Sequence, residues 1–215
     1  MRLFLTTFFL LLLCSGCSSP KPSYYTLNAI PIPQSTLGSN AVRLMIGPVS
    51  LPDAVDKAHL VVNTTNNEIE VLKYDRWGGS LKADVGRVIA ANLARELDIS
   101  NIWNFSQNTQ TNFDYQILID VQNLQSKLGE SVFVDVLWTI KPAASKNSEL
   151  VKTSDRKSTG VKTRGGNPET SFVPKVLMGR STVTEPVTQP GLDALVAAQS
   201  RAFAKVSAEI AASIR

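Results

Sequence analysis

The chain of 215 residues is 43% apolar and 19% charged, proportions typical of a globular domain with a hydrophobic core rather than of a disordered chain. Its net charge of +4 is too small to indicate nucleic-acid binding by itself. No internal repeat of fixed period is present, so the sequence favours one ordinary domain over a repeat array.

Residues 1–16 have the features of a secretory signal peptide. Met1-Arg2 is a short basic start, residues 3–13 are almost wholly apolar, and the small residues Ser15 and Gly16 follow. The apolar run is shorter than the roughly 20 residues that a membrane-spanning helix needs. Cleavage after residue 16 is therefore expected.

Cys17 is the expected site of lipid attachment, because Ser15-Gly16-Cys17 resembles the end of a bacterial lipobox. In that pathway the thiol receives a diacylglyceryl group and the new amine is acylated, and no other cofactor is expected. Cys14 stands where a lipobox usually has leucine. One alternative is an ordinary cleaved signal that leaves Cys17 as a free thiol. A CxxC redox or zinc motif is disfavoured, because no strand precedes it and no Cys/His cluster completes it.

Residues 17–22 are expected to be a lipidated tether before a domain that spans 23–215. In lipoprotein sorting, an aspartate after the lipidated cysteine commonly retains the protein in the inner membrane. Ser18 occupies that position here. The expected location is therefore the outer membrane, with the chain lipid-anchored on the periplasmic face.

The first half of the chain alternates strand-like segments with turns. Residues 23–27 have strand chemistry. Residues 41–49 read as a strand that should stop at Gly47-Pro48. Residues 58–74 are predicted to form a hairpin, because two strand-like runs flank a turn rich in asparagine and threonine.

Two amphipathic helices are predicted. The first is capped by Ser80 and should end near Asp98, with leucines, valines and an isoleucine at helical spacing on one face. The second runs from about Leu192 to Ile214, after Pro190-Gly191. Its apolar stripe should pack on a sheet, and a helix lying on a membrane surface is the disfavoured alternative because its polar face has few cations.

The second half of the chain supplies the remaining strands. Residues 113–127 and 131–140 alternate apolar side chains and are predicted to form a second hairpin. Residues 149–163 are expected to be a polar edge strand. Residues 164–190 are predicted to be a long loop with one helical turn near 173–178. Together these elements predict a single α/β (α+β) domain, in which two main helices pack on one face of a mixed and largely antiparallel sheet.

Catalytic chemistry finds little support. The single histidine, His59, starts an apolar strand and is interpreted as a structural or surface residue. No HExxH, P-loop or serine-elbow motif is present. The aspartates near turns and at a helix start are interpreted as capping residues rather than acid–base groups. Trp77 and Trp138 are expected to be core residues.

A basic run follows the second predicted hairpin. The plain interpretation is a solvated hairpin whose lysines protect a sheet edge, and the functional alternative is contact with anionic headgroups or an acidic partner. The candidate contact residues are Lys152, Arg156, Lys157, Lys162 and Arg164.

Four segments, in order, are similar to the ABC-type transport auxiliary lipoproteins of the PqiC type. They are Tyr24-Tyr25-Thr26-Leu27, IGPVSLPDAVDKAHLV (46–61), RWGGSLKADVGRVIAANLARELD (76–98) and PGLDALVAAQSRAFAKVSAEIAASIR (190–215). With the lipobox in front, the resemblance covers nearly the whole mature chain.

The resemblance implies a non-enzymatic accessory subunit of a transport system built from MCE-domain proteins, which carry lipids between the two membranes. The protein would dock the periplasmic conduit at the outer membrane, with Leu51, Pro52, Asp53 and Trp77 as candidate partner contacts. A homo-oligomer is a further hypothesis, because MCE assemblies are rings. An envelope assembly or binding lipoprotein for cell-wall or secretion machinery is the alternative function.

Overall fold

The computed structural model of the protein describes residues 20–29, 42–105, 112–143 and 176–215. The predicted signal peptide, Cys17, Ser18, the expected strand at 149–163 and the five basic candidate residues all lie outside these ranges. The elements are β1 (Ser23–Tyr25), β2 (Leu44–Ser50), β3 (His59–Asn63), β4 (Ile69–Trp77), α2 (Leu81–Leu97), β5 (Ile102–Asn104), β6 (Tyr115–Lys127), β7 (Ser131–Pro142), β8 (Leu177–Pro186) and α4 (Leu192–Ile214).

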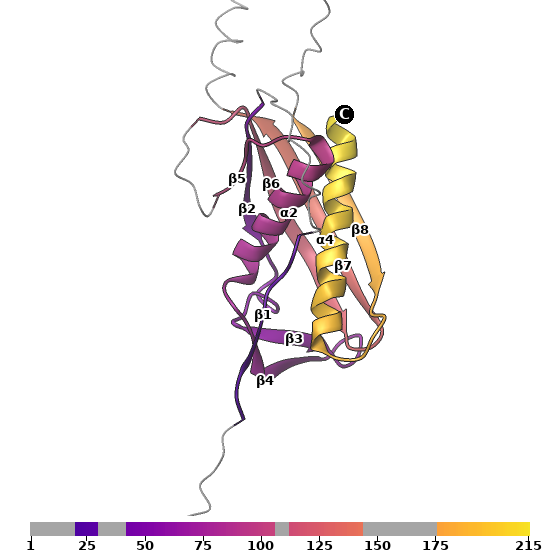
Figure 1. Ribbon diagram of the computed structural model, residues 1–215. Helices are drawn as coiled ribbons and strands as arrows, with labels where there is room; N and C mark the ends of the chain where they lie inside the picture. Colours follow the sequence, from indigo (N-terminus) through magenta and orange to yellow (C-terminus); the bar gives the residue numbers. More distant parts are fainter. Residues whose placement is uncertain (1–19, 30–41, 106–111, 144–175) are drawn as a thin grey trace, which may run out of the picture.

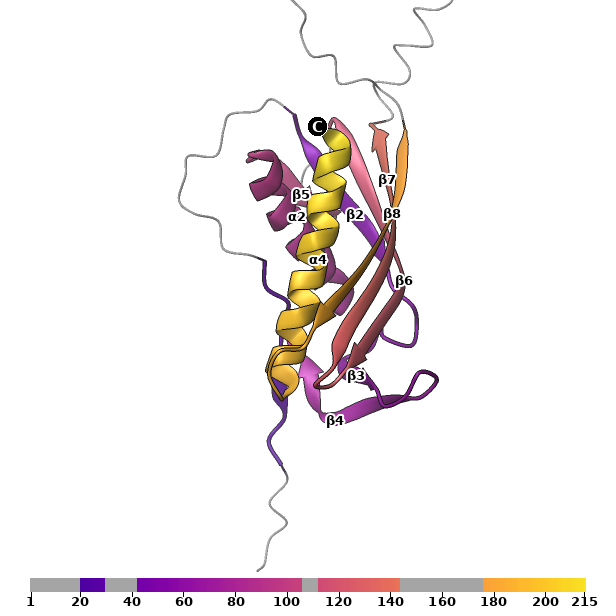
Figure 2. The same ribbon diagram turned by 90° about the vertical axis from the view of Figure 1, so that its right-hand side faces the viewer.

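Two sheets and two helices make up the architecture (Figures 1 and 2). The larger sheet has the strand order β5-β2-β6-β7-β8, and the smaller has the order β1-β4-β3. The long β6–β7 and β7–β8 pairings are antiparallel, whereas β2 runs parallel to both β5 and β6. The predicted mixed fold is confirmed, and the strands that sequence reasoning assigned to one sheet are divided between two.

Both helices cover the same face of the larger sheet, as predicted (Figure 2). Helix α4 packs on β7 and β8, α2 packs on β2 and β5, and the helices contact each other. Alternate residues of β6 and β7 point into this layer, including Ile117, Ile119, Val134 and Val136, all buried. The core lies between the sheet and the apolar stripes of the two helices.

Local sequence signals determine where several elements begin and end. The Ser80 side chain accepts a hydrogen bond from the Ala83 N–H at the start of α2, and Asp98 ends the helix in the left-handed conformation. The hairpin predicted at 58–74 is confirmed as β3–β4, and the second one as β6–β7. Both Trp77 and Trp138 are buried, as expected.

Two predicted elements are wrong. Strand β2 does not stop at Gly47-Pro48 but continues to Ser50, with a register shift against β6 between Ile46 and Val49. Gly47 has a φ of +107°, which glycine adopts without the strain that a side chain would add, so the strand passes this point as an irregularity.

The second error concerns the end of the predicted loop at 164–190. Residues 177–186 form β8. The helical turn was expected near 173–178, and the described residues of that range, 176–178, are not helical. Ser181, Val183 and Glu185 are buried in alternation with exposed residues, which is the pattern of a half-buried strand. Nearby prolines and glycines concealed that pattern, and Pro186 sits at the end of an edge strand, where proline is tolerated.

Candidate functional site

The four segments singled out in the sequence converge at one end of the domain. Strand β1 pairs in parallel with the end of β4, so that Tyr25 lies opposite Trp77. The Gly78 N–H donates to the Tyr25 carbonyl (2.7 Å), and the Trp77 N–H donates to the Ala58 carbonyl (3.0 Å). The first turn of α4 lies beside β1. Residues that are far apart in sequence thus surround the point where the chain enters the fold.

The segment after β1 is held by side chains from both helices. The Thr26 hydroxyl and the Leu27 N–H donate to Asp84 Oδ2 of α2 (2.8 and 3.2 Å). Arg87 Nη2 donates to the Leu27 carbonyl (2.6 Å) and pairs with Asp84 (2.9 Å). From α4, the Ser200 hydroxyl accepts the Asn28 N–H (3.1 Å). The extended segment is therefore clamped between the two helices.

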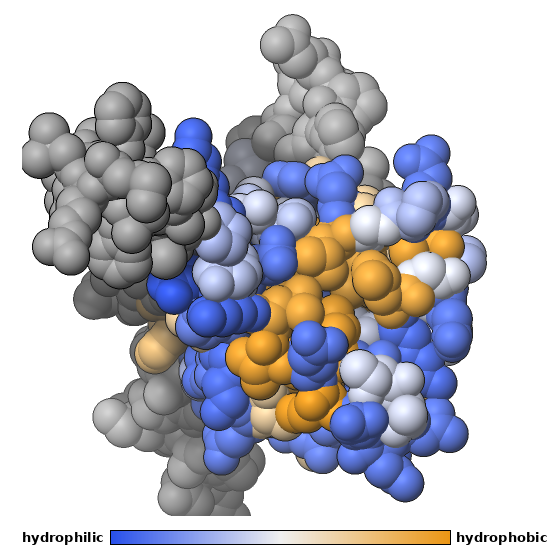
Figure 3. All heavy atoms as spheres, turned by 90° about the horizontal axis from the view of Figure 1, so that it is seen from below, coloured by the Kyte–Doolittle hydropathy of each residue, from blue (hydrophilic) through white to orange (hydrophobic). Residues whose placement is uncertain are grey.

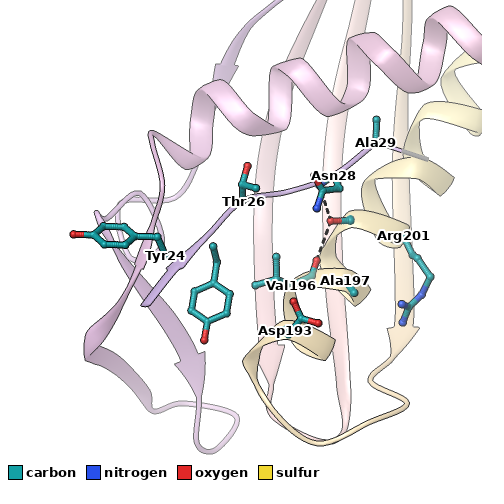
Figure 4. Close-up of a pocket in the computed structure, with 10 residues that line it drawn as sticks. Tyr24, Thr26, Asn28, Ala29, Asp193, Val196, Ala197 and Arg201 are labelled. Atoms are coloured by element: carbon teal, nitrogen blue, oxygen red, sulfur yellow. Dashed lines mark hydrogen bonds between the residues drawn. The ribbon is translucent and has the colours of Figure 1, made fainter. Parts of the chain in front are cut away.

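A cavity of about 350 Å³ lies beside this segment (Figure 4). One wall is the segment from Tyr24 to Ala29, and the other is α4 with Asp193, Val196 and Arg201. The Tyr25 hydroxyl donates to Asp75 Oδ1 (3.2 Å), and burial, followed by the negative charge of Asp75, raises the pKa of the phenol above 10.0. Tyr25 therefore stays neutral and acts as a structural donor.

The loop between β2 and β3 is a tight turn with an exposed tip. The Pro52 carbonyl accepts the N–H groups of Val55 and Asp56, both at 3.0 Å. Asp56 in turn pairs with Lys82 of α2 (2.7 Å), which fixes the loop to the helix start. Leu51 is buried, Pro52 is half-buried and Asp53 is exposed. The tip of this loop is therefore the part that a partner protein could contact.

The model of one protein family, the ABC-type transport auxiliary lipoprotein component, matches residues 25–211. The chain belongs to this family. The match includes nearly all of the four segments that surround β1, so the family pattern extends over both sheets and both helices.

Solved structures agree with this family fold. The chain superposes on the crystal structure of an uncharacterized protein with a TM-score of 0.63 and 15% identity, covering 91% of this chain and 100% of the other. A Xanthomonas campestris protein of the family DUF330 gives a TM-score of 0.60 and 14% identity, covering 88% of this chain and 92% of the other. No curated protein matches the chain significantly.

As a transport auxiliary lipoprotein, the chain does not present all four predicted contact residues to a partner. Leu51 and Trp77 are buried in the core, because they hold the loop and the β4–α2 turn in place. Neither side chain is available at a surface, which corrects their assignment as direct contacts. For Pro52 and Asp53 the partner hypothesis stays a prediction.

Sequence reasoning missed the side chains that hold the β1 segment. The sequence pattern indicates only a capping role for an aspartate at a helix start, yet Asp84 accepts hydrogen bonds from residues almost 60 positions earlier in the chain. The signal within reach was the Asp84–Arg87 spacing of three, which places both charges on one side of the first helical turns. Its long-range partner could not be read from that spacing.

Two other ion-paired carboxylates lie on β7 and β8. Arg180 donates to Asp135 at 2.5 and 2.8 Å, and this hydrogen bond lowers the pKa of Asp135 although burial opposes it. Glu185 pairs with Lys205 and Arg201 of α4. In the described ranges, no group of three or more His, Cys, Asp and Glu residues could hold a metal ion. No helix in this part of the chain is both long and apolar enough to cross a bilayer.

Proposed function

We propose that the protein is the outer-membrane accessory subunit of an MCE-type intermembrane phospholipid transport system. Acylated at Cys17, it would dock the periplasmic conduit at the inner face of the outer membrane and carry out no catalytic step. Membership of the transport auxiliary lipoprotein family supports an accessory role in a transporter.

One observation carries the proposal. The segments that resemble the auxiliary lipoproteins converge where the chain leaves its predicted tether, around β1. A subunit that links a membrane anchor to a soluble conduit needs a rigid connection between the two. The hydrogen bonds from Asp84, Arg87 and Ser200 to the β1 segment supply that connection.

The exposed loop tip is the proposed contact with the conduit. Asp53 is exposed, while the residues on either side hold the loop through the Pro52 carbonyl and the Asp56–Lys82 ion pair. A fixed loop with an exposed tip loses little conformational entropy on binding. A homo-oligomer is a further part of the hypothesis.

The test is a site-specific photocrosslink in cells that produce the natively lipidated protein. A photoreactive amino acid replaces Asp53 in one strain and Glu209 in another, since Glu209 is an exposed acidic residue of α4 away from the loop. Crosslinked products are purified through this protein and identified by mass spectrometry, together with bound phospholipids.

Recovery of an MCE-domain protein from position 53, but not from position 209, is the expected result. Recovery of cell-wall enzymes or secretion subunits from position 53 would replace the proposal by the envelope-assembly function. The same extracts report the anchor, because a Cys17→Ser variant should leave the membrane fraction. Retention of that variant in the outer membrane would contradict the anchor.

A further inference from the structure

An apolar patch covers the end of the molecule that lies at the bottom of Figure 1. Seen from below, apolar side chains gather there, surrounded by hydrophilic ones (Figure 3). The large apolar side chains exposed on the elements at this end include Ile69 (44%) and Val71 (48%) of β4 and Leu128 (51%) of the β6–β7 turn. We call these three residues the end patch.

Two hydrogen bonds next to the end patch join the end of β6 to the β3–β4 hairpin. The Ser126 N–H of β6 donates to Asn63 Oδ1 of β3 (2.7 Å), and Lys127 Nζ donates to Asn66 Oδ1 in the β3–β4 turn (2.8 Å). Ile69 and Val71 lie two positions apart on one strand and so share a face. Single exposed apolar residues are ordinary on a soluble domain, whereas a group of them marks an interaction surface.

The position of the chain start identifies what covers this surface. The described segment that leads into β1 starts at the same end of the molecule, below β4 in both Figures 1 and 2. Its first residue is Pro20. Cys17 is three residues earlier, and three extended residues span at most about 10 Å. A cysteine acylated in the bilayer would therefore hold this end, rather than the opposite one, against the membrane.

The charges around the end patch favour a lipid surface of low net charge. Exposed Glu68 and Glu70 lie beside exposed Lys73, and Lys127 is on the adjacent element. Because both signs are present, attraction to an anionic membrane is weak. Contact would depend on insertion of the apolar side chains.

We propose that the end patch rests on the phospholipid surface to which the protein is anchored, inserting Ile69, Val71 and Leu128 among the headgroups. The contact fixes the orientation of the domain on the membrane. This inference rests on the proposed acylation of Cys17, but not on the identity of the docking partner.

The experiment uses the mature, acylated protein reconstituted in phosphatidylethanolamine vesicles with a minor share of phosphatidylglycerol. Loss of residues 1–16 and acylation of Cys17 leave no free thiol in the chain. Val71→Cys and Leu128→Cys then each give a single site for an environment-sensitive fluorophore. The matched control is Met178→Cys, at a side chain that is 78% exposed on β8 and near the opposite end of β7 from the 128–130 turn.

The expected result is a shift of emission to shorter wavelength at positions 71 and 128. Quenching by phospholipids with a spin label on the acyl chain should accompany it, and position 178 should show neither effect. Both signals should persist at high salt, because apolar insertion is not screened. Water-like emission at all three positions would overturn the proposal. Signals that vanish at high salt would also overturn it, in favour of contact by basic residues.

Two controls separate this inference from the proposed function. Mass spectrometry of the purified protein shows directly whether Cys17 is acylated, and an unmodified cysteine would overturn both proposals. The vesicles contain no partner protein, so a missing MCE protein cannot affect the result. If positions 71 and 128 respond only after the conduit protein is added, the end patch is a protein-docking surface and the membrane contact is wrong.

Discussion

Asp84 links the segment after β1 to helix α2 through one carboxylate. Its oxygens accept hydrogen bonds from the Thr26 hydroxyl, the Leu27 N–H and the Arg87 guanidinium. Leu27 is fully buried, and its N–H donates to the Asp84 carboxylate. Asp84 also lies in the first turn of α2, where a negative charge is favourable.

Asp84→Ala is expected to lower the free energy of unfolding by about 2–3 kcal/mol, because it removes hydrogen bonds to a charged group and leaves a buried donor unpaired. Urea denaturation followed by circular dichroism measures this change. Asp53→Ala, at an exposed loop position, is the matched control and should stay within about 0.5 kcal/mol of the unchanged protein. Equal free energies of unfolding for Asp84→Ala and Asp53→Ala would refute the conclusion that Asp84 holds the segment after β1.

Glu185 should make stability depend on pH in the acidic range. Burial by itself would raise its pKa, but hydrogen bonds and charges from Lys205 and Arg201 outweigh burial and lower the pKa below 4.5. The unfolded chain therefore takes up this proton first as the pH falls. The stabilisation is complete above the unfolded pKa and is lost as the pH falls through the folded one.

Glu185→Gln tests this linkage. The variant should be less stable than the unchanged protein at pH 7. This difference in unfolding free energy should shrink as the pH falls below about 4.5, the unfolded value, and then through the lower folded pKa, below which both side chains are neutral. Unfolding free energies measured from pH 7 to pH 3 give the comparison. A difference in unfolding free energy that stays constant with pH would show that the charge of Glu185 contributes nothing to stability.

At the scale of elements, β8 depends on a close contact with β7. A Cβ placed on Gly179 would lie 2.1 Å from Cζ2 of Trp138, whose ring is buried and whose Nε1–H donates to the Ser181 hydroxyl (3.1 Å). Even the smallest side chain at position 179 must therefore displace the indole or the strand.

Gly179→Ala is expected to destabilise the protein by about 2 kcal/mol or more and to change the fluorescence of Trp138. Thermal unfolding and tryptophan emission spectra report the two effects. Gly79→Ala serves as the control, because a Cβ there meets nothing within 4 Å. An unchanged melting temperature for Gly179→Ala would mean that β8 is not held against the indole.

Elements with a regular pattern of apolar residues were predictable, and irregular ones were not. The apolar stripes predict α2 and α4 as helices at the right positions, because their spacing matches only the helical period. The alternation in β6 and β7 likewise matches only the strand period and predicts both strands. Strand β8 was missed because its alternation is short and a buried serine and glutamate take apolar places in it. Their partners, Trp138, Arg201 and Lys205, come from other elements.

The site was predictable in composition but not in arrangement. Family-like segments containing Tyr25, Trp77 and the Leu51-Pro52-Asp53 loop were recognisable in the sequence, yet which side chains are buried depends on tertiary packing. Nothing local distinguishes Trp77, which is buried, from a surface tryptophan. The clamp by Asp84 and Ser200 joins residues separated by 57 to 172 positions, which local spacing does not reveal.

At the scale of the whole molecule, the sorting hypothesis makes the choice of membrane depend on Ser18 in the predicted tether. Ser18→Asp should move the protein from the outer-membrane to the inner-membrane fraction, because aspartate after the lipidated cysteine commonly retains lipoproteins. Density-gradient separation of membranes checks this, with Ser18→Asn as the isosteric neutral control. An unchanged distribution of both variants would contradict the sorting hypothesis.

The clamp on the β1 segment also has a mechanical consequence. A subunit fixed to one membrane and bound to a device that reaches the other carries tension whenever the two membranes move apart. Under the proposed function, such tension would enter the fold through β1, which pairs with β4 in parallel. A pull along β1 loads its hydrogen bonds together, in shear, and the bonds from Asp84, Arg87 and Ser200 pass the force to both helices. With the proposed anchor in place, these bonds would resist force at the point where the described chain begins.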